Sequence, residues 1–172
     1  MSRAARTSAL FSLVSLSLPW AADAAPVQAS PTASAEIVLV RPLTLVRTAD
    51  MDFATLGATT GGSATINPLT SAMTVTGGLF HLGGTPSPAR YAGAASKQTV
   101  VNIRIPKTAV LIRRVGGTET LSVSNFTLDG QDKKVLAQQQ SFTFAVGATI
   151  TVPAGTVEGV YTGEIDVTVQ YP

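Results

Sequence analysis

The sequence predicts an all-β fold, in the form of one antiparallel sandwich of about seven to ten short strands. Runs of Val, Ile, Thr and Phe with a period of two recur at close spacing, and 15 Gly and 10 Pro punctuate them. Beyond the N-terminal leader, no window of about eleven residues keeps apolar side chains at helical spacing. The sequence therefore favours strands over helices along the whole mature chain.

The clearest strand signal is the final segment, residues 161–171, where side chains alternate with only Gly163 as a gap. Thr, Gln and acidic residues occupy one parity. The other parity carries the apolar side chains of Tyr161, Ile165, Val167, Val169 and Tyr171. Alternation of this kind buries one face of a strand and leaves the other in water. We therefore predict one long strand whose apolar face packs on the core.

The first 24 residues have the features of a cleaved signal peptide. Arg3 and Arg6 give a positive start, residues 9–18 are mostly apolar, and small residues end the stretch at Ala24. Cleavage is expected after Ala24 or Ala25, with export through the Sec pathway to the periplasm, the cell surface or the extracellular space. No other segment is apolar for long enough to anchor the mature chain in a membrane.

The mature chain is expected to consist of a tether and one domain. Residues 25–34 contain two prolines and no apolar period, which predicts a flexible tether. Residues 35–172 are numerous enough for a single core of ordinary size. Because cysteine is absent, that core must hold an exported domain together without disulfides.

The charge balance argues against a protein that binds polyanions. The chain has 12 basic and 10 acidic residues, of which the leader contains Arg3, Arg6 and Asp23, so ten and nine remain. A nucleic-acid reader would carry clustered basic side chains interleaved with aromatic ones. We therefore expect no nucleic-acid partner.

Three local patterns add detail to the predicted sandwich. Residues 36–40 form an apolar run that suits a strand covered on both faces. Residues 72–76 and 79–82 flank a Gly-Gly pair, which predicts a tight hairpin. Residues 83–95 contain two X-Pro pairs and predict a surface loop, with Tyr91 packing at its end.

The reactive side chains of the sequence favour neither catalysis nor metal binding. His81 is the only histidine, no thiol exists, and no G-x-S-x-G motif is present. Two acid pairs, Asp50 with Asp52 and Glu164 with Asp166, fit a turn or a solvated strand face better than a glycosidase or calcium site. We expect no catalytic residue, no cofactor and no metal.

The N-terminal apolar run is a candidate for β-strand addition, in which an extended segment completes the sheet of a neighbouring molecule. Ala35, Ile37 and Leu39 share one parity and would fill successive pockets of the neighbour's groove. The groove itself would be lined by the apolar face of the final segment, namely Ile165, Val167, Val169 and Tyr171. The same run could instead pair within its own domain as a first strand, and the sequence leaves both arrangements open.

Several motifs, taken in order, resemble a known bacterial family. They are L-T-L at residues 43–45, D-M-D-F at 50–53, G-G-T-P-S-P-A-R at 83–90, V-P-A-G at 152–155, Y-T-G at 161–163 and V-T-V at 167–169. The mature chain resembles the secreted family called domain of unknown function 4402 and, more distantly, spore coat protein U and the archaic chaperone–usher pilins. This resemblance implies an immunoglobulin-like sandwich, a periplasmic chaperone as partner, and assembly by donated strands. The chain differs from the pilins in lacking their disulfide and in carrying an insertion at residues 157–160.

Together these features favour a secreted structural protein of the cell surface, without enzymatic activity. It would be a pilin-like subunit that associates with copies of itself, or with homologous subunits, by strand addition and that serves cell adhesion. The alternative is a self-contained secreted module that binds a carbohydrate or a protein through loops around residues 85–91.

Overall fold

The computed structural model describes residues 35–138 and 140–172. The predicted signal peptide (1–24) and tether (25–34) lie outside the described residues. Val38–Pro172 forms one compact unit, whereas Ala35, Glu36 and Ile37 belong to the separate unit that precedes it. The folded domain is therefore Val38–Pro172.

The domain is all-β with antiparallel pairing, which confirms the predicted fold class. In chain order its strands are β1 (Thr44–Ala49), β2 (Thr55–Ile66), β3 (Met73–Gly83), β4 (Ala89–Ala94), β5 (Thr99–Arg104), β6 (Val110–Arg114), β7 (Thr120–Leu128), β8 (Lys133–Leu136), β9 (Ser141–Val152), β10 (Tyr161–Thr162) and β11 (Thr168–Gln170).

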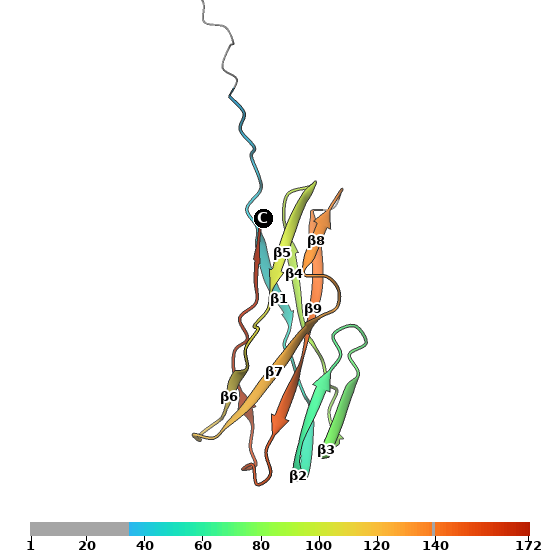
Figure 1. Cartoon of the computed structure of the whole chain (residues 1–172), viewed down its shortest axis with the longest axis vertical. Helices are drawn as coiled ribbons and strands as arrows, with labels where there is room; N and C mark the ends of the chain where they lie inside the picture. Colours follow the sequence, from blue (N-terminus) through green and yellow to red (C-terminus); the bar gives the residue numbers. More distant parts are fainter. Residues whose placement is uncertain (1–34, 139) are drawn as a thin grey trace, which may run out of the picture. The chain divides into compact units, whose positions relative to one another are not determined.

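Two sheets make up the sandwich. The larger sheet has the order β1-β4-β9-β7-β6-β10, and the smaller sheet has the order β11-β5-β8. β9 is the organising strand: its first half pairs with β4, its second half pairs with β2, and β7 lies along its opposite edge (Figure 1). β3 extends the larger sheet beyond β2.

The first core cluster packs side chains of the larger sheet, mainly from β4 and β9, against β5 and β8 of the smaller sheet. Val101, Phe144 and Val146 are at most 2% exposed there. The ring of Phe144 stacks on that of Tyr91 at a centroid distance of 5.1 Å and on that of Phe142 at 6.3 Å. Aromatic stacking adds to the burial that stabilises this half of the domain.

The second core cluster lies on the inner face of β2, β3, β7 and β9. Its buried members are Ala64, Leu79, Leu121, Val123, Ala148, Ile150 and Val152. β9 contributes to both clusters because every second side chain from Phe142 to Val152 points inward and is buried.

The surface loop predicted for residues 83–95 is wrong in its second half, because β4 forms there and lies between β1 and β9. β4 has the sequence ARYAGA, and its alanines and glycine have low strand propensity, so the pattern gave no strand signal. A Cβ at Gly93 would lie 2.3 Å from the ring of Phe142 and 2.7 Å from the carbonyl oxygen of Thr44. Close packing thus selects small residues at the centre of the sheet.

The hairpin predicted around the Gly-Gly pair is also wrong, because β3 continues through Gly77 and Gly78 as one strand. The turn lies instead between β2 and β3. There the Ser71 N–H donates to the carbonyl of Asn67, and the Asn67 N–H donates to the carbonyl of Ala72, both at 2.9 Å. The side-chain oxygen of Asn67 accepts from the N–H groups of Leu69 and Thr70, which is a common way to stabilise a turn.

The final segment is not one continuous strand. β10 pairs with β6 in the larger sheet, β11 pairs with β5 in the smaller sheet, and residues 163–167 connect them without strand pairing. At the break, a Cβ on Gly163 would lie only 2.6 Å from Cγ2 of Ile112. The segment therefore passes from one sheet to the other, which its alternation alone could not indicate.

Candidate functional site

The final segment keeps the predicted alternation of faces, but its apolar face is only half-buried. Ile165, Val167, Val169 and Tyr171 are all of intermediate exposure. The residues between them, Glu164, Asp166, Thr168 and Gln170, are exposed. Val167, Val169 and Tyr171 pack against the first core cluster from its rim. This face therefore contacts the core while remaining partly open to solvent.

Tyr171 ties the end of the chain to the start of the domain. Its hydroxyl donates to the carbonyl oxygen of Arg41 at 2.8 Å and accepts from the N–H of Ser96 at 3.0 Å. Figure 1 shows the C-terminus beside the beginning of β1. The final segment and β1 are thus neighbours although they belong to different sheets.

Within residues 35–138 and 140–172, β1 and β11 each have one backbone edge without a strand partner. There β1 pairs with β4 alone, and β11 pairs with β5 alone. Leu43 and Leu45, at the start of β1, are half-buried against the same core cluster as Val167 and Val169. Edge strands with free N–H and C=O groups are templates for an additional strand. The two edges and their half-buried apolar side chains form the candidate acceptor site.

The predicted donor run forms no strand within the described residues, since pairing starts only at Thr44. The strand predicted for residues 36–40 within this domain is therefore not formed. The side chains of Ile37 and Leu39 are 81% and 87% exposed, and Ala35 is exposed as well. Of the three predicted donor residues, only Leu39 belongs to the domain unit.

The loop of the alternative binding hypothesis is largely occupied by packing. Pro88, Ala89 and Tyr91 are buried, and burial raises the pKa of the Tyr91 hydroxyl. Ser87 forms an isolated two-way backbone bridge with Asp52, at 2.9 Å in both directions. In residues 85–91, only Thr85 and Arg90 are exposed.

Asp50 and Asp52, the first of the two acid pairs, have structural partners, whereas Glu164 and Asp166 are exposed on the final segment. Asp52 Oδ1 accepts from the N–H of Ala54 at 2.7 Å, which supports the positive φ of Ala54. Asp50 forms an exposed ion pair with Arg47. Within the described residues, no three His, Cys, Asp or Glu side chains are placed to hold a metal ion. His81 is exposed on β3.

An open hollow of about 740 Å³ lies where the end of β5 faces β7. Ile105, Phe126 and Leu128 supply apolar lining, and Arg104 and Lys107 supply charged groups. β7 has a bulge beside the hollow, between Ser124 and Thr127, where Asn125 adopts a positive φ of 50°. No local sequence signal marks the hollow, because it arises from the separation of two sheets.

A two-point ion pair braces the turn between β6 and β7. Arg114 Nε donates to Glu119 Oε2 at 2.8 Å, and Arg114 Nη2 donates to Oε1 at 3.1 Å. These hydrogen bonds, with help from backbone N–H groups, lower the pKa of Glu119 to about 2. The same strand, β6, holds β10 at the start of the final segment.

Comparison with known proteins supports a family assignment. No helix in the described part of the chain is long and apolar enough to cross a membrane. Neither a search of curated proteins nor a search of solved structures found a match. The family model described as "Domain of unknown function (DUF4402)" matches residues 43–171, which cover all eleven strands. The chain belongs to the DUF4402 family.

Proposed function

We propose that this protein is a non-enzymatic structural subunit of a bacterial surface assembly, exported through the Sec pathway, that associates with copies of itself by β-strand addition. The acceptor is the pair of free edges on β1 and β11, and the donor is the apolar run around Ile37 and Leu39. A periplasmic chaperone is the partner expected to cover these edges before assembly.

The observation that carries the proposal is the half-burial of the apolar side chains beside the two free edges. Leu45 on β1 and Val169 on β11 each touch the core yet keep part of their surface in water. An added strand would cover apolar area on both, at about 25 cal/mol for each Å² removed from water. It would also satisfy the backbone groups of the two edges.

The chemistry of the donor run agrees with this role. Ile37, Val38 and Leu39 are each more than 75% exposed, although exposed apolar runs are costly in water. Consecutive side chains of a strand point to opposite faces, so Ile37 and Leu39 would enter the acceptor together while Val38 faces away. Burial in another subunit would remove the cost of leaving this run in solvent.

Disulfide trapping tests the proposal directly, because the chain contains no cysteine of its own. One preparation of the mature chain carries Val38→Cys, and a second, with a tag of different mass, carries Gln170→Cys or Thr168→Cys. Paired residues of neighbouring strands come close enough for a disulfide. We expect the mixture to form a heterologous disulfide dimer under mild oxidation.

The control replaces the acceptor cysteine by Thr151→Cys, which is exposed on β9 and has β2 and β7 on its two sides. This variant should not be trapped by Val38→Cys. The proposal is overturned if a single chain carrying both Val38→Cys and Gln170→Cys closes an internal disulfide while the mixture forms none. That result would mean that the run pairs in its own domain.

A further inference from the structure

Two rows of hydroxyl side chains cross the outer face of four neighbouring strands, β3, β2, β9 and β7. The first row consists of Thr76, Ser63, Thr151 and Ser122, each directly paired with the next. The second row consists of Thr74, Thr65, Thr149 and Ser124, paired in the same order. We call these eight residues the hydroxyl rows.

The hydroxyl rows lie on the solvent side of the sheet. The residues between them on each strand, such as Ala64, Val123 and Ile150, point the other way and are buried in the second core cluster. Neighbouring strands are about 4.8 Å apart, and residues two apart on one strand, which set the distance between the two rows, are about 6.8 Å apart. Some hydroxyls bond one another, as in Ser63 with Thr76 and Thr65 with Thr149, both at 2.8 Å.

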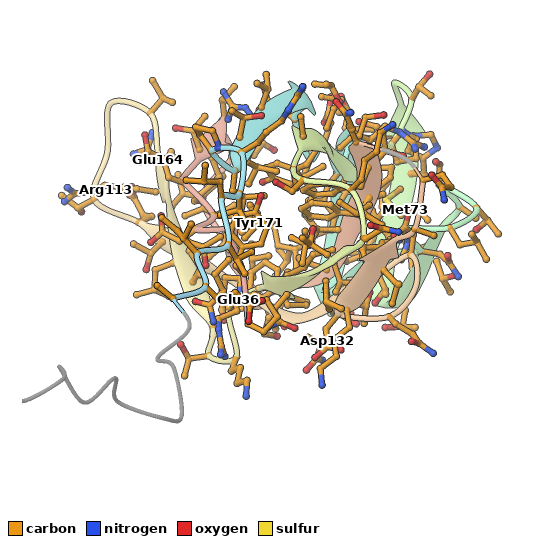
Figure 2. The ribbon with its side chains drawn as sticks, turned by 90° about the horizontal axis from the view of Figure 1, so that it is seen from above. Glu36, Met73, Arg113, Asp132, Glu164 and Tyr171 are labelled. Atoms are coloured by element: carbon orange, nitrogen blue, oxygen red, sulfur yellow. The ribbon has the colours of Figure 1, made fainter. Side chains whose placement is uncertain are left out.

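The four strands that carry the rows form an uncharged block. β2, β3, β7 and β9 contain 12, 11, 9 and 12 residues, 44 in total, and none is Asp, Glu, Lys or Arg. His81 is the one residue of these four strands with an ionisable side chain. In Figure 2, Met73 at the start of β3 and Arg113 on β6, the strand next to β7, lie at opposite sides of the domain. Such a face offers hydrogen bonds without attracting ions, so it suits a neutral partner.

An exposed aromatic ring continues the face along β3. Phe80 points to the same side as Thr76, four residues away, and is 43% exposed. Its ring lies on the backbone of β2, where a Cβ at Gly57 would come within 2.5 Å of two ring atoms. Because glycine lets the ring lie close to the sheet, the ring is held in place beside the exposed Leu82. Aromatic rings held in this way offer an apolar surface next to polar groups.

We infer that this face binds a neutral polysaccharide chain, with the hydroxyl rows bonding the sugar hydroxyls and Phe80 contacting an apolar sugar face. Serine and threonine hydroxyls both donate and accept, as sugar hydroxyls do. Twist turns neighbouring strands by about 20–25°, so the four strands rotate through roughly 60–75° in all. A flexible polymer chain can follow this twisted surface. A ligand with a flat, rigid surface, such as the face of a crystal, cannot. The inference does not rest on strand addition.

Isothermal titration calorimetry of the mature chain tests the inference. The neutral probes are hydroxyethyl cellulose, a soluble β-1,3-glucan and dextran, and alginate is the anionic comparison. We expect binding to at least one neutral polymer and none to alginate. The variant that carries both Thr76→Val and Thr151→Val, called the row variant, should bind about tenfold more weakly. It loses two hydrogen bonds to the ligand while the shape of the side chains is kept.

The matched control carries Thr127→Val on β7 and Thr143→Val on β9, two exposed threonines on the same strands outside the hydroxyl rows. It should bind like the wild type, and thermal unfolding should show both double variants folded. Phe80→Leu, which keeps an apolar cover over Gly57, should also weaken binding. The inference is overturned if no neutral polymer binds, if alginate binds equally well, or if the row variant and the control bind alike. If the wild type forms a dimer and the row variant does not, the partner that covers this face is instead a second copy of the chain.

Discussion

β9 and the final segment both alternate apolar and polar side chains, yet their apolar faces end in different environments. On β9 all six inward side chains, from Phe142 to Val152, are buried. On the final segment the corresponding four, from Ile165 to Tyr171, are only half-buried. Equal patterns in the sequence thus correspond to unequal burial in the structure.

The difference follows from the place of each strand in its sheet. β9 lies in the interior of the larger sheet, with β4 along its first half and β2 and β7 along its second half. β11 is an edge strand of the smaller sheet, and among the described strands it pairs with β5 alone. A period of two reports which side chains share a face, and it carries no information about how many strands flank the backbone. Half-burial on β11 is therefore a property of the sheet edge, and it is what a donated strand would change.

The largest effect is expected from Phe144→Ala on β9. Phe144 is 2% exposed and stacks between Tyr91 and Phe142, so its removal leaves a cavity that two flat rings cannot fill. We expect the free energy of unfolding to fall by about 3–5 kcal/mol. Urea denaturation of a chain that spans residues 25–172 measures this. A loss below about 1 kcal/mol would show that β9 is not the centre of the core.

Substitutions at two glycines compare how tightly β9 and the final segment are packed. A Cβ at Gly147 on β9 would lie 2.2 Å from the carbonyl oxygen of Ile66 and 2.6 Å from Cδ of Pro68, so the backbone must move. A Cβ at Gly163 would meet chiefly the side chain of Ile112. We expect Gly147→Ala to cost about 3 kcal/mol and Gly163→Ala about 1 kcal/mol. Thermal unfolding of the two variants shows which substitution costs more stability. A larger loss for Gly163→Ala would contradict the view that the final segment is the more adaptable region.

A matched pair of valines isolates the effect of burial. Val146→Ala removes a side chain that is 0% exposed, and Val169→Ala makes the same change at a half-buried site. We expect losses of roughly 2 and 1 kcal/mol in the unassembled domain, in proportion to the apolar area lost. Saturation with a peptide spanning residues 34–43 should raise the cost of Val169→Ala and leave that of Val146→Ala unchanged. Equal costs without the peptide would mean that β11 is already fully covered.

Sequence reasoning predicted the parts of the fold that depend on side-chain alternation. It predicted the fold class and the side chains that share the apolar face of the final segment, because β-branched and aromatic residues alternate with polar ones there. It failed for β4, whose alanines and Gly93 fit a crowded position between strands and carry no strand propensity. It also failed at the break in the final segment, since the approach of Gly163 to Ile112 depends on residues far apart in the sequence.

At the candidate sites too, the sequence predicts which side chains share a face, but it does not predict which strands lie next to them. The apolar face of the final segment could be assigned from parity alone, but its half-burial could not, because exposure depends on which strands pair with β11 and β1. The hydroxyl rows consist of four short motifs, such as T-V-T on β3 and T-I-T on β9, which look unremarkable one at a time. Only the pairing register brings them into line.

The smallest effect is expected at the turn that supports β10, from the ion pair between Glu119 and Arg114. The folded-state pKa of Glu119, about 2, lies below its ordinary value of 4.5, so the pair stabilises the fold fully above pH 4.5. This contribution is lost as the pH falls from 4.5 towards 2, because the carboxylate becomes protonated. The melting temperature of Glu119→Gln should therefore lie slightly below that of the wild type at pH 6 and approach it near pH 2. Asp166→Asn, which removes one negative charge from the exposed face of the final segment, controls for net charge. If the gap for Glu119→Gln stayed constant from pH 6 to pH 2, the turn would owe its stability to the shape of the side chain, and β10 would be held without help from this charge.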